Sequence, residues 1–518
     1  MELKRTDIIL KPNNARVLFR PFEPADRNRA IRIVARVMAL SDTEVEHVLE
    51  IVLSEFHGRH QRLKQFFITR FQHLSDFLLT DASVSETRQL LLGAYFTQEY
   101  ALESAALFNP SMVWHPDQSG LSEGSKRFVL SLRAVGEGHI SSITFRSGVI
   151  DAKHGIHLDQ PTRFVTAPEA VPNSQYDKAL FLRKLAELGV GNGFVTSILV
   201  TLDEQFTLAD LHAAVAAERR QHRLQSAEFD ITANAIVALA KSNYETTFAP
   251  DQSLSERAIF PYSPTETNGI EDARFVEFHD DDGSCRYYAT YTAFDGKVIL
   301  PQLLETEDFS RFSISTLNGP EVRNKGLALF PRKIDGLYAM LSRQDGENLY
   351  IMFSDMLNFW YTKQLLMKPT FAWEYVQVGN CGSPIETEAG WLVLTHGVGA
   401  MRKYSMGAIL LDLKDPTRVI GRLCEPLLAP NETEREGYVP NVIYSCGGVV
   451  HNGELIIPYA ADRRAIEIQG RLKISAVVFG PFLADRSRRI RWNFCGFIES
   501  RWKICGSLNR KNDRVPWC

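Results

Sequence analysis

The residues best suited to acid–base chemistry lie in one segment, Asn268-Gly-Ile-Glu-Asp-Ala-Arg274. Asn268-Gly269 predicts a sharp turn, because glycine tolerates positive φ and asparagine nearly does. In the strand-like run that follows, Glu271 and Asp272 would point to opposite sides, so only one of them could face a given cavity. An isolated Glu-Asp-x-Arg is more often a polar turn than a site, so its meaning depends on the rest of the chain.

Polar side chains recur at loop and strand-end positions before and after this segment, and several are cationic. Arginine binds phosphate in a bidentate manner and lysine acts as a point charge, so such a pocket suits an anion beside a polyhydroxylated ligand. Taken singly, Lys325 and Arg343 are more often surface residues, and His396 is as often a structural histidine as a functional one. The candidates are Asn109, Ser111, Arg133, Glu271, Asp272, Arg274, Asp295, Lys325, Arg343, His396, Asn441 and Asp462.

Short β-like runs, broken by Gly, Pro, Asn and Asp, must position these residues. The last four of the five clearest runs begin 49, 54 and 63 residues apart. A recurrence near 50 residues, with several strands per unit, is typical of a β-propeller in which each repeat is one blade. The sequence therefore predicts a mainly β chain with a five-bladed β-propeller over 105–465, its clearest strands being 128–133, 287–292, 336–343, 390–396 and 453–459.

Three other segments differ in texture from the predicted propeller. Residues 1–104 read as an N-terminal helical region, with a capping box at Ser41-Asp-Thr-Glu44. Helical runs between blades one and two predict an insertion at about 155–255. Residues 466–518 read as an atypical basic C-terminal tail, since 471–518 hold eleven Lys or Arg and three Asp or Glu. The helical runs of the insertion are 179–188, 208–217 and 231–240.

Composition excludes several functional classes for the 518 residues. A net charge of −4 gives no electrostatic footprint for nucleic acid or an anionic membrane. The chain has no run of 18 apolar residues, and its first residues lack the apolar core of a signal peptide, so we expect a cytoplasmic protein. The seven cysteines form no Cys-x-x-Cys pair and have no nearby histidine. This spacing favours free thiols over a zinc site or a disulfide framework.

With these motifs in view, the chain from about 105 to 465 resembles glycoside hydrolase family 130, which contains β-mannoside phosphorylases and β-mannosidases. The resemblance implies a five-bladed propeller and leaves residues 1–104, the insertion and the tail outside the family pattern. It rests on ordered motifs in all five predicted blades: Phe108–Ser111, Asn268–Arg274, Tyr291–Gly296, Asn324–Lys325, Leu329–Pro331, Thr395–Val398, Ile409–Leu413, Val439–Val442 and Cys446–Gly447.

The resemblance also implies a reaction, the inverting phosphorolysis of a β-mannoside to α-mannose 1-phosphate. It makes Asp272 the acid, which acts on the glycosidic oxygen through a hydroxyl of the mannosyl unit. Phosphate attacks from the opposite face and needs no general base, only cations to orient it. Lys325, Arg343 and His396 would hold the phosphate. The sugar-binding candidates would be Asn109, Ser111, Arg133, Glu271, Arg274, Asp295, Asn441 and Asp462.

Three departures from the family pattern keep other functions open. Ala273 stands where the family usually has proline. Gln377 stands where phosphorylases commonly have lysine, and Tyr438 replaces an acidic residue. The alternatives are an inverting β-mannosidase and a non-catalytic carbohydrate-binding propeller. We expect no metal or organic cofactor, phosphate as co-substrate, and a homo-oligomer by analogy with relatives. In a hydrolase the base would be Glu271, Glu386 or Glu436.

Overall fold

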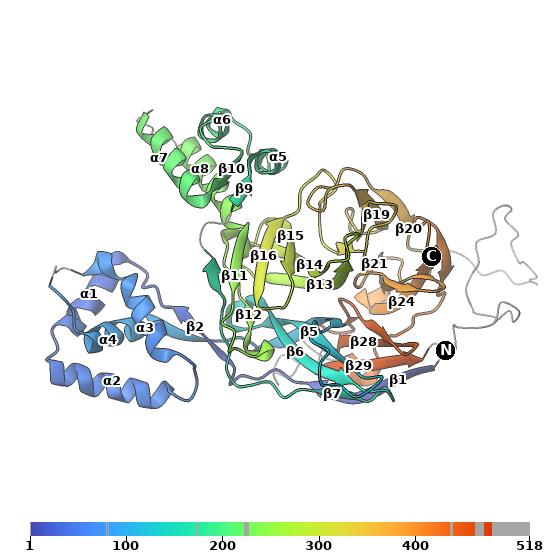
Figure 1. Cartoon of the computed structure of the whole chain (residues 1–518), viewed down its shortest axis with the longest axis horizontal. Helices are drawn as coiled ribbons and strands as arrows, with labels where there is room; N and C mark the ends of the chain where they lie inside the picture. The colour runs from blue at the N-terminus through green and yellow to red at the C-terminus, as the bar shows by residue number, and fades with distance from the viewer. Residues whose placement is uncertain are drawn as a thin grey trace, which may run out of the picture.

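The computed structural model describes most of the chain, namely residues 2–78, 80, 82–171, 175–221, 227–435, 439–461 and 471–478. These residues are mainly β, with eight α-helices. The strands form five antiparallel sheets of at least four strands, together with two short two-stranded ribbons. Figure 1 shows the five sheets gathered in one body, from which two groups of helices project.

The five sheets follow one another along the chain, with short strands added at their edges. The first contains β4 (Ala106–Trp114), β5 (Lys126–Val135), β6 (Ser141–Ile150), β7 (Ile156–Leu158) and β12 (Ala258–Ile259). The second contains β8 (Glu169–Val171), β11 (Tyr244–Thr247), β13 (Ile270–His279), β14 (Cys285–Phe294), β15 (Ile299–Thr306) and β16 (Arg311–Thr316). The third contains β17 (Ala328–Leu329), β18 (Tyr338–Ser342), β19 (Leu349–Ser354) and β20 (Gln364–Met367).

The last two sheets complete the β-rich body. The fourth contains β21 (Gln377–Asn380), β22 (Ile385–Thr387), β23 (Gly390–Val398), β24 (Tyr404–Leu411) and β25 (Val419–Arg422). The fifth contains β26 (Ile443–Tyr444), β27 (Val449–His451), β28 (Glu454–Ala461), β29 (Arg471–Val478) and β1 (Glu2–Leu10). The five strands predicted from the repeat are confirmed as β5, β14, β18, β23 and β28, and each lies in a different sheet.

The first helical group projects from one side of the sheets (Figure 1). It is joined to them by the ribbon of β2 (Val17–Pro21) and β3 (Thr97–Ala101). The predicted capping box at Ser41 and Glu44 is confirmed at the start of the second helix. Among the residues that the structure describes, no helix combines the length and apolar character needed to span a bilayer. The group consists of α1 (Arg27–Met38), α2 (Asp42–Phe56), α3 (Leu63–Gln72) and α4 (Glu86–Tyr95).

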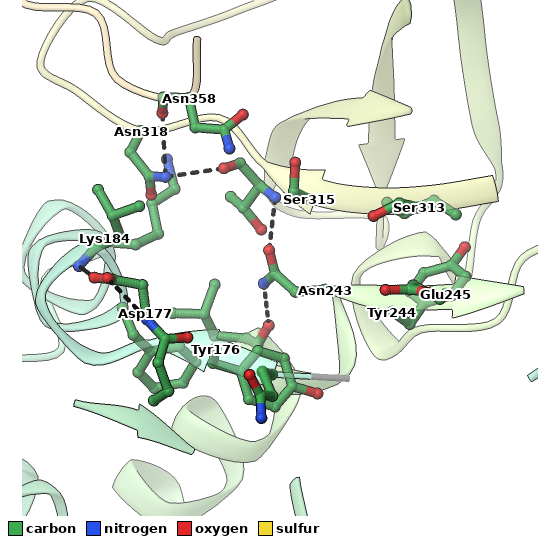
Figure 2. Close-up of a pocket in the computed structure, with 17 residues that line it drawn as sticks. Tyr176, Asp177, Lys184, Asn243, Tyr244, Glu245, Ser313, Ser315, Asn318 and Asn358 are labelled. Atoms are coloured by element: carbon green, nitrogen blue, oxygen red, sulfur yellow. Dashed lines mark hydrogen bonds between the residues drawn. The ribbon is translucent and has the colours of Figure 1, made fainter. Parts of the chain in front are cut away.

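The second helical group lies within the predicted insertion, and hydrogen bonds connect this region to the end of β16. Lys184 Nζ donates to Leu317 O at 2.8 Å, and Asn243 Oδ1 accepts from Thr316 N at 2.7 Å. Figure 2 shows these side chains around a pocket of 260 Å³ between the helices and β16. The three predicted helical runs are confirmed. The group consists of α5 (Lys178–Glu187), α6 (Gly193–Val200), α7 (Leu208–Gln221) and α8 (Ala227–Lys241), with a ribbon of β9 (Gln175–Asp177) and β10 (Gln205–Thr207).

The two ends of the described chain differ from the predicted helical region and tail. β1, within 1–104, pairs antiparallel with β29, within 466–518, and β29 also pairs with β28. The strands β1 and β29 therefore belong to the fifth sheet. Such a pairing joins residues more than 400 positions apart, as in Leu3 opposite Val477, so no local pattern announces it. The rest of the predicted tail, residues 479–518, lies outside the described residues.

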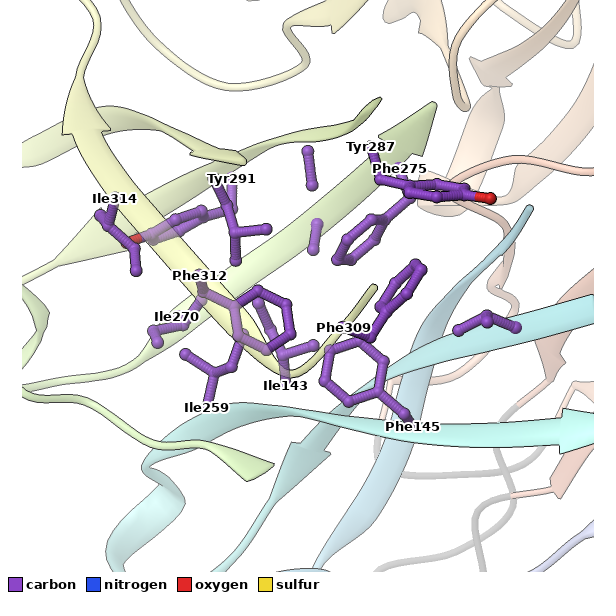
Figure 3. Packing of buried hydrophobic residues seen from close by; sticks show 14 of the residues in the cluster. Ile143, Phe145, Ile259, Ile270, Phe275, Tyr287, Tyr291, Phe309, Phe312 and Ile314 are labelled. Atoms are coloured by element: carbon purple, nitrogen blue, oxygen red, sulfur yellow. The ribbon is translucent and has the colours of Figure 1, made fainter. Parts of the chain in front are cut away.

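A large aromatic cluster joins the first and second sheets (Figure 3). Phe145 of β6 packs edge-to-face on Phe275 of β13 and on Phe309, with ring centroids 6.0 and 5.7 Å apart. Phe312 stacks on Phe145 from β16. All four rings are at most 3% exposed, so each removes a large apolar area from water. This packing fixes the position of β13, the strand that carries the Glu-Asp-x-Arg motif.

A buried ion network holds the start of the first helical region against the first sheet. Glu103, which is fully buried, accepts from Arg16 Nη1 at 2.5 Å and from Arg146 Nη2 at 2.6 Å. Burial and the second arginine lower the pKa of Arg16 to about 10. The single carboxylate therefore compensates two guanidinium groups that have little contact with water.

We expect Glu103→Gln to lower the free energy of unfolding by about 3–5 kcal/mol, because it leaves two buried guanidinium groups without their carboxylate. Urea unfolding measures this loss of free energy. The matched control is Glu245→Gln, which breaks the ion pair with Arg311, where the side chains are 31% and 64% exposed. That change should cost less than about 1 kcal/mol. Equal losses in the two variants would contradict the role of the network.

Candidate active site

A β-bulge in β13 positions the Glu-Asp-x-Arg motif. Glu271 pairs with Thr292 of β14 and Arg274 pairs with Thr290, so β13 carries one residue more than its partner between these points. Asp272 lies in the bulge with φ 58°, a left-handed conformation that is uncommon for residues other than glycine. The turn before it needs glycine, since a Cβ on Gly269 would lie 2.3 Å from Ser141 Oγ.

A second bulge in β4 lies opposite the first. Phe108 pairs with Arg133 and Ser111 pairs with Ser131, which again leaves one extra residue. Asn109 occupies this bulge with φ 46°. Its Nδ2 donates a hydrogen bond to Asp272 Oδ1. The two left-handed residues, one from the first sheet and one from the second, thus meet through their side chains.

Three cations determine the charge state of Asp272. Arg133 Nη1 lies 3.7 Å from Oδ1, and Arg274 Nη2 lies 3.8 Å from Oδ2. Burial acts to raise the pKa of Asp272, but Arg274, Arg133 and Lys325, with the hydrogen bond from Asn109, lower it below its ordinary value. In the site as it stands, Asp272 is a carboxylate at neutral pH.

Glu271 faces the same cluster, against the prediction that the two carboxylates point to opposite sides. Arg133 Nη2 donates to Glu271 Oε1 at 2.8 Å, and Lys325 Nζ donates to Oε2. Arg133 therefore contacts both Glu271 and Asp272. The prediction was wrong because it assumed a regular strand, whereas the bulge interrupts the alternation of side chains.

Arg274 connects the cluster to two other sheets and is only 2% exposed. Its Nε donates to Cys381 O at 2.9 Å, and its Nη2 donates to Tyr444 OH at 3.0 Å. Burial acts to lower the pKa of Arg274, but Tyr444, Cys446 and Asp272 raise it above its ordinary value. The guanidinium group is therefore always charged, and its donors are directed at three separate segments.

Arg343 and His396 form the other side of the cluster. Arg343 Nη1 lies 3.0 Å from His396 Nε2, and it donates at 2.7 Å to Gln377 when the amide oxygen of Gln377 faces it. Burial, followed by Arg343 and Arg274, lowers the pKa of His396 well below its ordinary value. His396 is therefore a neutral acceptor here.

The remaining predicted residues have other described contacts. Ser111 Oγ, 1% exposed, accepts from Phe275 N at 3.0 Å and so links β4 to β13. Asp295 Oδ1 accepts from Lys297 N at 2.8 Å within its own turn. Asn441 Oδ1 accepts from Arg435 Nε at 3.0 Å. Asp462 lies outside the described residues.

Sequence reasoning missed Tyr444 of β26. Its hydroxyl accepts from Arg274, and its ring centroid lies 5.0 Å from that of His396, so it joins the two halves of the cluster. An aromatic residue in a β-like run usually belongs to a core, and only the three-dimensional contact distinguishes it. The carboxylates of Glu271 and Asp272 are already engaged by cations, so the cluster suits an anionic ligand rather than a metal ion.

The buried neutral imidazole of His396 predicts a pH dependence of stability. Below about pH 6.5 the unfolded chain gains a proton at this residue that the folded chain does not bind, so the free energy of unfolding falls as pH falls. His396→Asn should reduce this slope by up to about 1.4 kcal/mol per pH unit between pH 6.5 and 5. Urea unfolding at several pH values measures the slope. The control is His47→Asn on α2, at an exposed position, and an unchanged slope in His396→Asn would refute the assignment.

The comparisons with known proteins agree with the motif. A family model for glycoside hydrolase family 130, described as beta-1,4-mannooligosaccharide phosphorylase, matches residues 223–473. A 1,2-beta-oligomannan phosphorylase of Thermoanaerobacter sp. (strain X514) is 39% identical over 211 residues, which cover 39% of this chain and 68% of that protein. A beta-1,2-mannobiose phosphorylase of Listeria innocua is 30% identical over 262 residues, which cover 48% of this chain and 71% of that protein. The chain therefore belongs to glycoside hydrolase family 130.

Proposed function

We propose that this protein is an inverting phosphorylase that cleaves a β-mannosidic bond with inorganic phosphate and releases α-mannose 1-phosphate. The observation that carries the proposal is the charge of the cluster. Three permanent cations lie beside two carboxylates, and a fourth, Arg343, contacts His396, which is neutral. The surplus of positive charge matches a phosphate dianion. The cations are Arg133, Arg274, Lys325 and Arg343.

The fold supports a propeller as the frame for this site. The five sheets would be the five blades, over about 105–465, with β1 and β29 completing the last one. The cluster draws residues from at least four sheets or the loops that follow them: Arg133 from the first, Asp272 from the second, His396 from the fourth and Tyr444 from the fifth. Such convergence is what the central channel of a propeller provides.

In the proposed reaction, Lys325 and Arg343 hold and orient the phosphate. Lys325 now donates to Glu271, so phosphate would compete with this carboxylate for the ammonium group. A Cβ placed on Gly326 would lie 3.7 Å from Arg343 Cβ, so the residue that follows Lys325 in the chain lies against Arg343. Gln377, in place of the usual lysine, would orient Arg343 instead of adding a third charge.

Asp272 must carry a proton to act as an acid, yet in the present cluster it is ionised. A bound phosphate dianion would offset the field of Lys325 and the nearby arginines. The same field lowers the pKa of Asp272, so phosphate binding would raise that pKa. The protonated acid would then assist departure of the leaving group through a mannosyl hydroxyl, while phosphate attacks the opposite face of the sugar.

A hydrolase is the second candidate, and it would need a carboxylate base for water. Glu271 is the candidate within the cluster, but it is bound to Arg133 and Lys325. Glu386 accepts from Arg332 Nη2 at 2.7 Å and is 41% exposed, and its described ion pair is with that residue alone. Glu436 lies outside the described residues.

The first test is to incubate the protein with β-1,2- and β-1,4-mannobiosides, with and without phosphate, and to quantify mannose 1-phosphate and free mannose. We expect phosphate-dependent mannose 1-phosphate, and a loss of turnover of about 10²–10⁴-fold in Asp272→Asn with sugar binding retained. Circular dichroism checks that the variant is folded. Free mannose at equal rates with and without phosphate would identify a hydrolase, and binding without turnover would identify a carbohydrate-binding protein.

The phosphate site can be tested separately. Lys325→Gln and Arg343→Gln should each raise the KM for phosphate about 10- to 100-fold, because each removes a charged hydrogen bond. The KM for the mannoside should change far less. The matched control is Lys363→Gln, which removes a cation paired with Glu321 at 2.7 Å outside the cluster. If the two parameters move together in Lys325→Gln and Arg343→Gln, the assignment of these residues to phosphate is wrong.

A further inference from the structure

Glu277, His279 and Cys285 bring three different metal-ligand atoms together on the β13–β14 hairpin. Glu277 and His279 are two residues apart on β13, so their side chains leave the same face of the strand. Cys285 begins β14 directly opposite His279 in the antiparallel register. The ligand atoms of all three residues lie within 4.8 Å of one another.

The distances between these atoms fit a shared tetrahedral ion. Glu277 Oε1 lies 3.6 Å from His279 Nε2 and 3.7 Å from Cys285 Sγ. Zn²⁺ bonds of about 2.0–2.3 Å in tetrahedral geometry place neighbouring ligand atoms about 3.3–3.5 Å apart. Two edges of the tetrahedron are thus already close to the required length, with the carboxylate oxygen between the imidazole and the thiol.

The donor types select the class of metal. One sulfur, one nitrogen and one oxygen donor suit Zn²⁺ or Co²⁺, whereas Ca²⁺ and Mg²⁺ prefer oxygen ligands throughout. The side chains of His279 and Glu277 are 62% and 27% exposed, so an ion can enter and water can complete its coordination.

The nearby cations do not oppose an ion at this position. Lys333 Nζ is paired with Asp280 at 2.7 Å and lies 3.7 Å from Asp281. Arg286, next to Cys285 in sequence, is paired with Glu305 and lies 3.7 Å from Glu307. Each positive charge near the hairpin already has acidic partners, which lowers its repulsion of a divalent cation.

We propose that Glu277, His279 and Cys285 form a binding site for one Zn²⁺ ion that fastens β13 to β14. The site is separate from the proposed chemistry, since five residues of strand place Glu277 about 17 Å along β13 from Asp272. The spacing of the cysteines did not predict this zinc site. His279 lies six residues before Cys285 in the sequence, and only the hairpin places the two residues opposite each other. The ion would stabilise the strand that carries Asp272.

The test uses the full chain, freed of metal by a chelator and titrated with Co²⁺ and then with Zn²⁺. We expect a thiolate-to-cobalt charge-transfer band that Zn²⁺ abolishes. Cys285→Ser should bind one metal ion fewer per chain and lose this band. His279→Ala should bind the metal ion at least about tenfold more weakly. The melting temperature should rise with Zn²⁺ in the unaltered chain and not in Cys285→Ser.

Two controls make the result specific. Cys424→Ser changes another cysteine of intermediate burial, outside the hairpin, and should leave the titration unchanged. Glu277→Gln removes the carboxylate but keeps its size, so it should weaken binding without unfolding the hairpin, as judged by circular dichroism. The proposal is overturned if Cys285→Ser retains both the charge-transfer band and the full number of bound ions, or if Cys424→Ser alone abolishes them.

Discussion

The burial of Arg274 is the constraint on which the centre of this protein depends. A guanidinium group that is 2% exposed keeps its charge only if the protein replaces the water that it has lost. Here the replacements come from Cys381 O, Tyr444 OH and Asp272, which belong to separate parts of the chain. The requirement to satisfy one arginine therefore draws several sheets to one point, and it also keeps the adjacent carboxylate ionised.

Two bulges bring further side chains to the same cluster. Left-handed backbone at Asn109 and Asp272 costs free energy, which regular strands would avoid. The bulges turn both side chains toward the cluster, where Asn109 donates to Asp272 and Arg133 contacts both Asp272 and Glu271. Local strain is thus offset by charged hydrogen bonds between two sheets. A substitution that restored regular pairing would separate groups that the cluster holds together.

Much of this arrangement follows from sequence patterns that reflect local forces. The strands at 128–133 and 390–396 are recognised as mainly apolar runs and the helices of the insertion by hydrophobic periodicity, and the structure confirms them. The pairing of β1 with β29, the orientation of Glu271 and the neutral state of His396 depend on partners distant in sequence or on burial. The family motif identified Asp272 and its cations, but the bulge that directs Glu271 inward has no signature in a pattern that assumes regular alternation.

The charge of the cluster suggests an order of events at the proposed site. Asp272 stays ionised beside Arg274, Arg133 and Lys325. A sugar that bound alone at the proposed site would therefore meet a carboxylate and no proton donor. We infer that phosphate, by neutralising part of this field, makes the protonated acid accessible at the moment when the nucleophile is in place. The coupling would restrain turnover in the absence of phosphate, since Asp272 would then remain a carboxylate. Excess positive charge would thus serve both to bind phosphate and to withhold the acid until phosphate is bound.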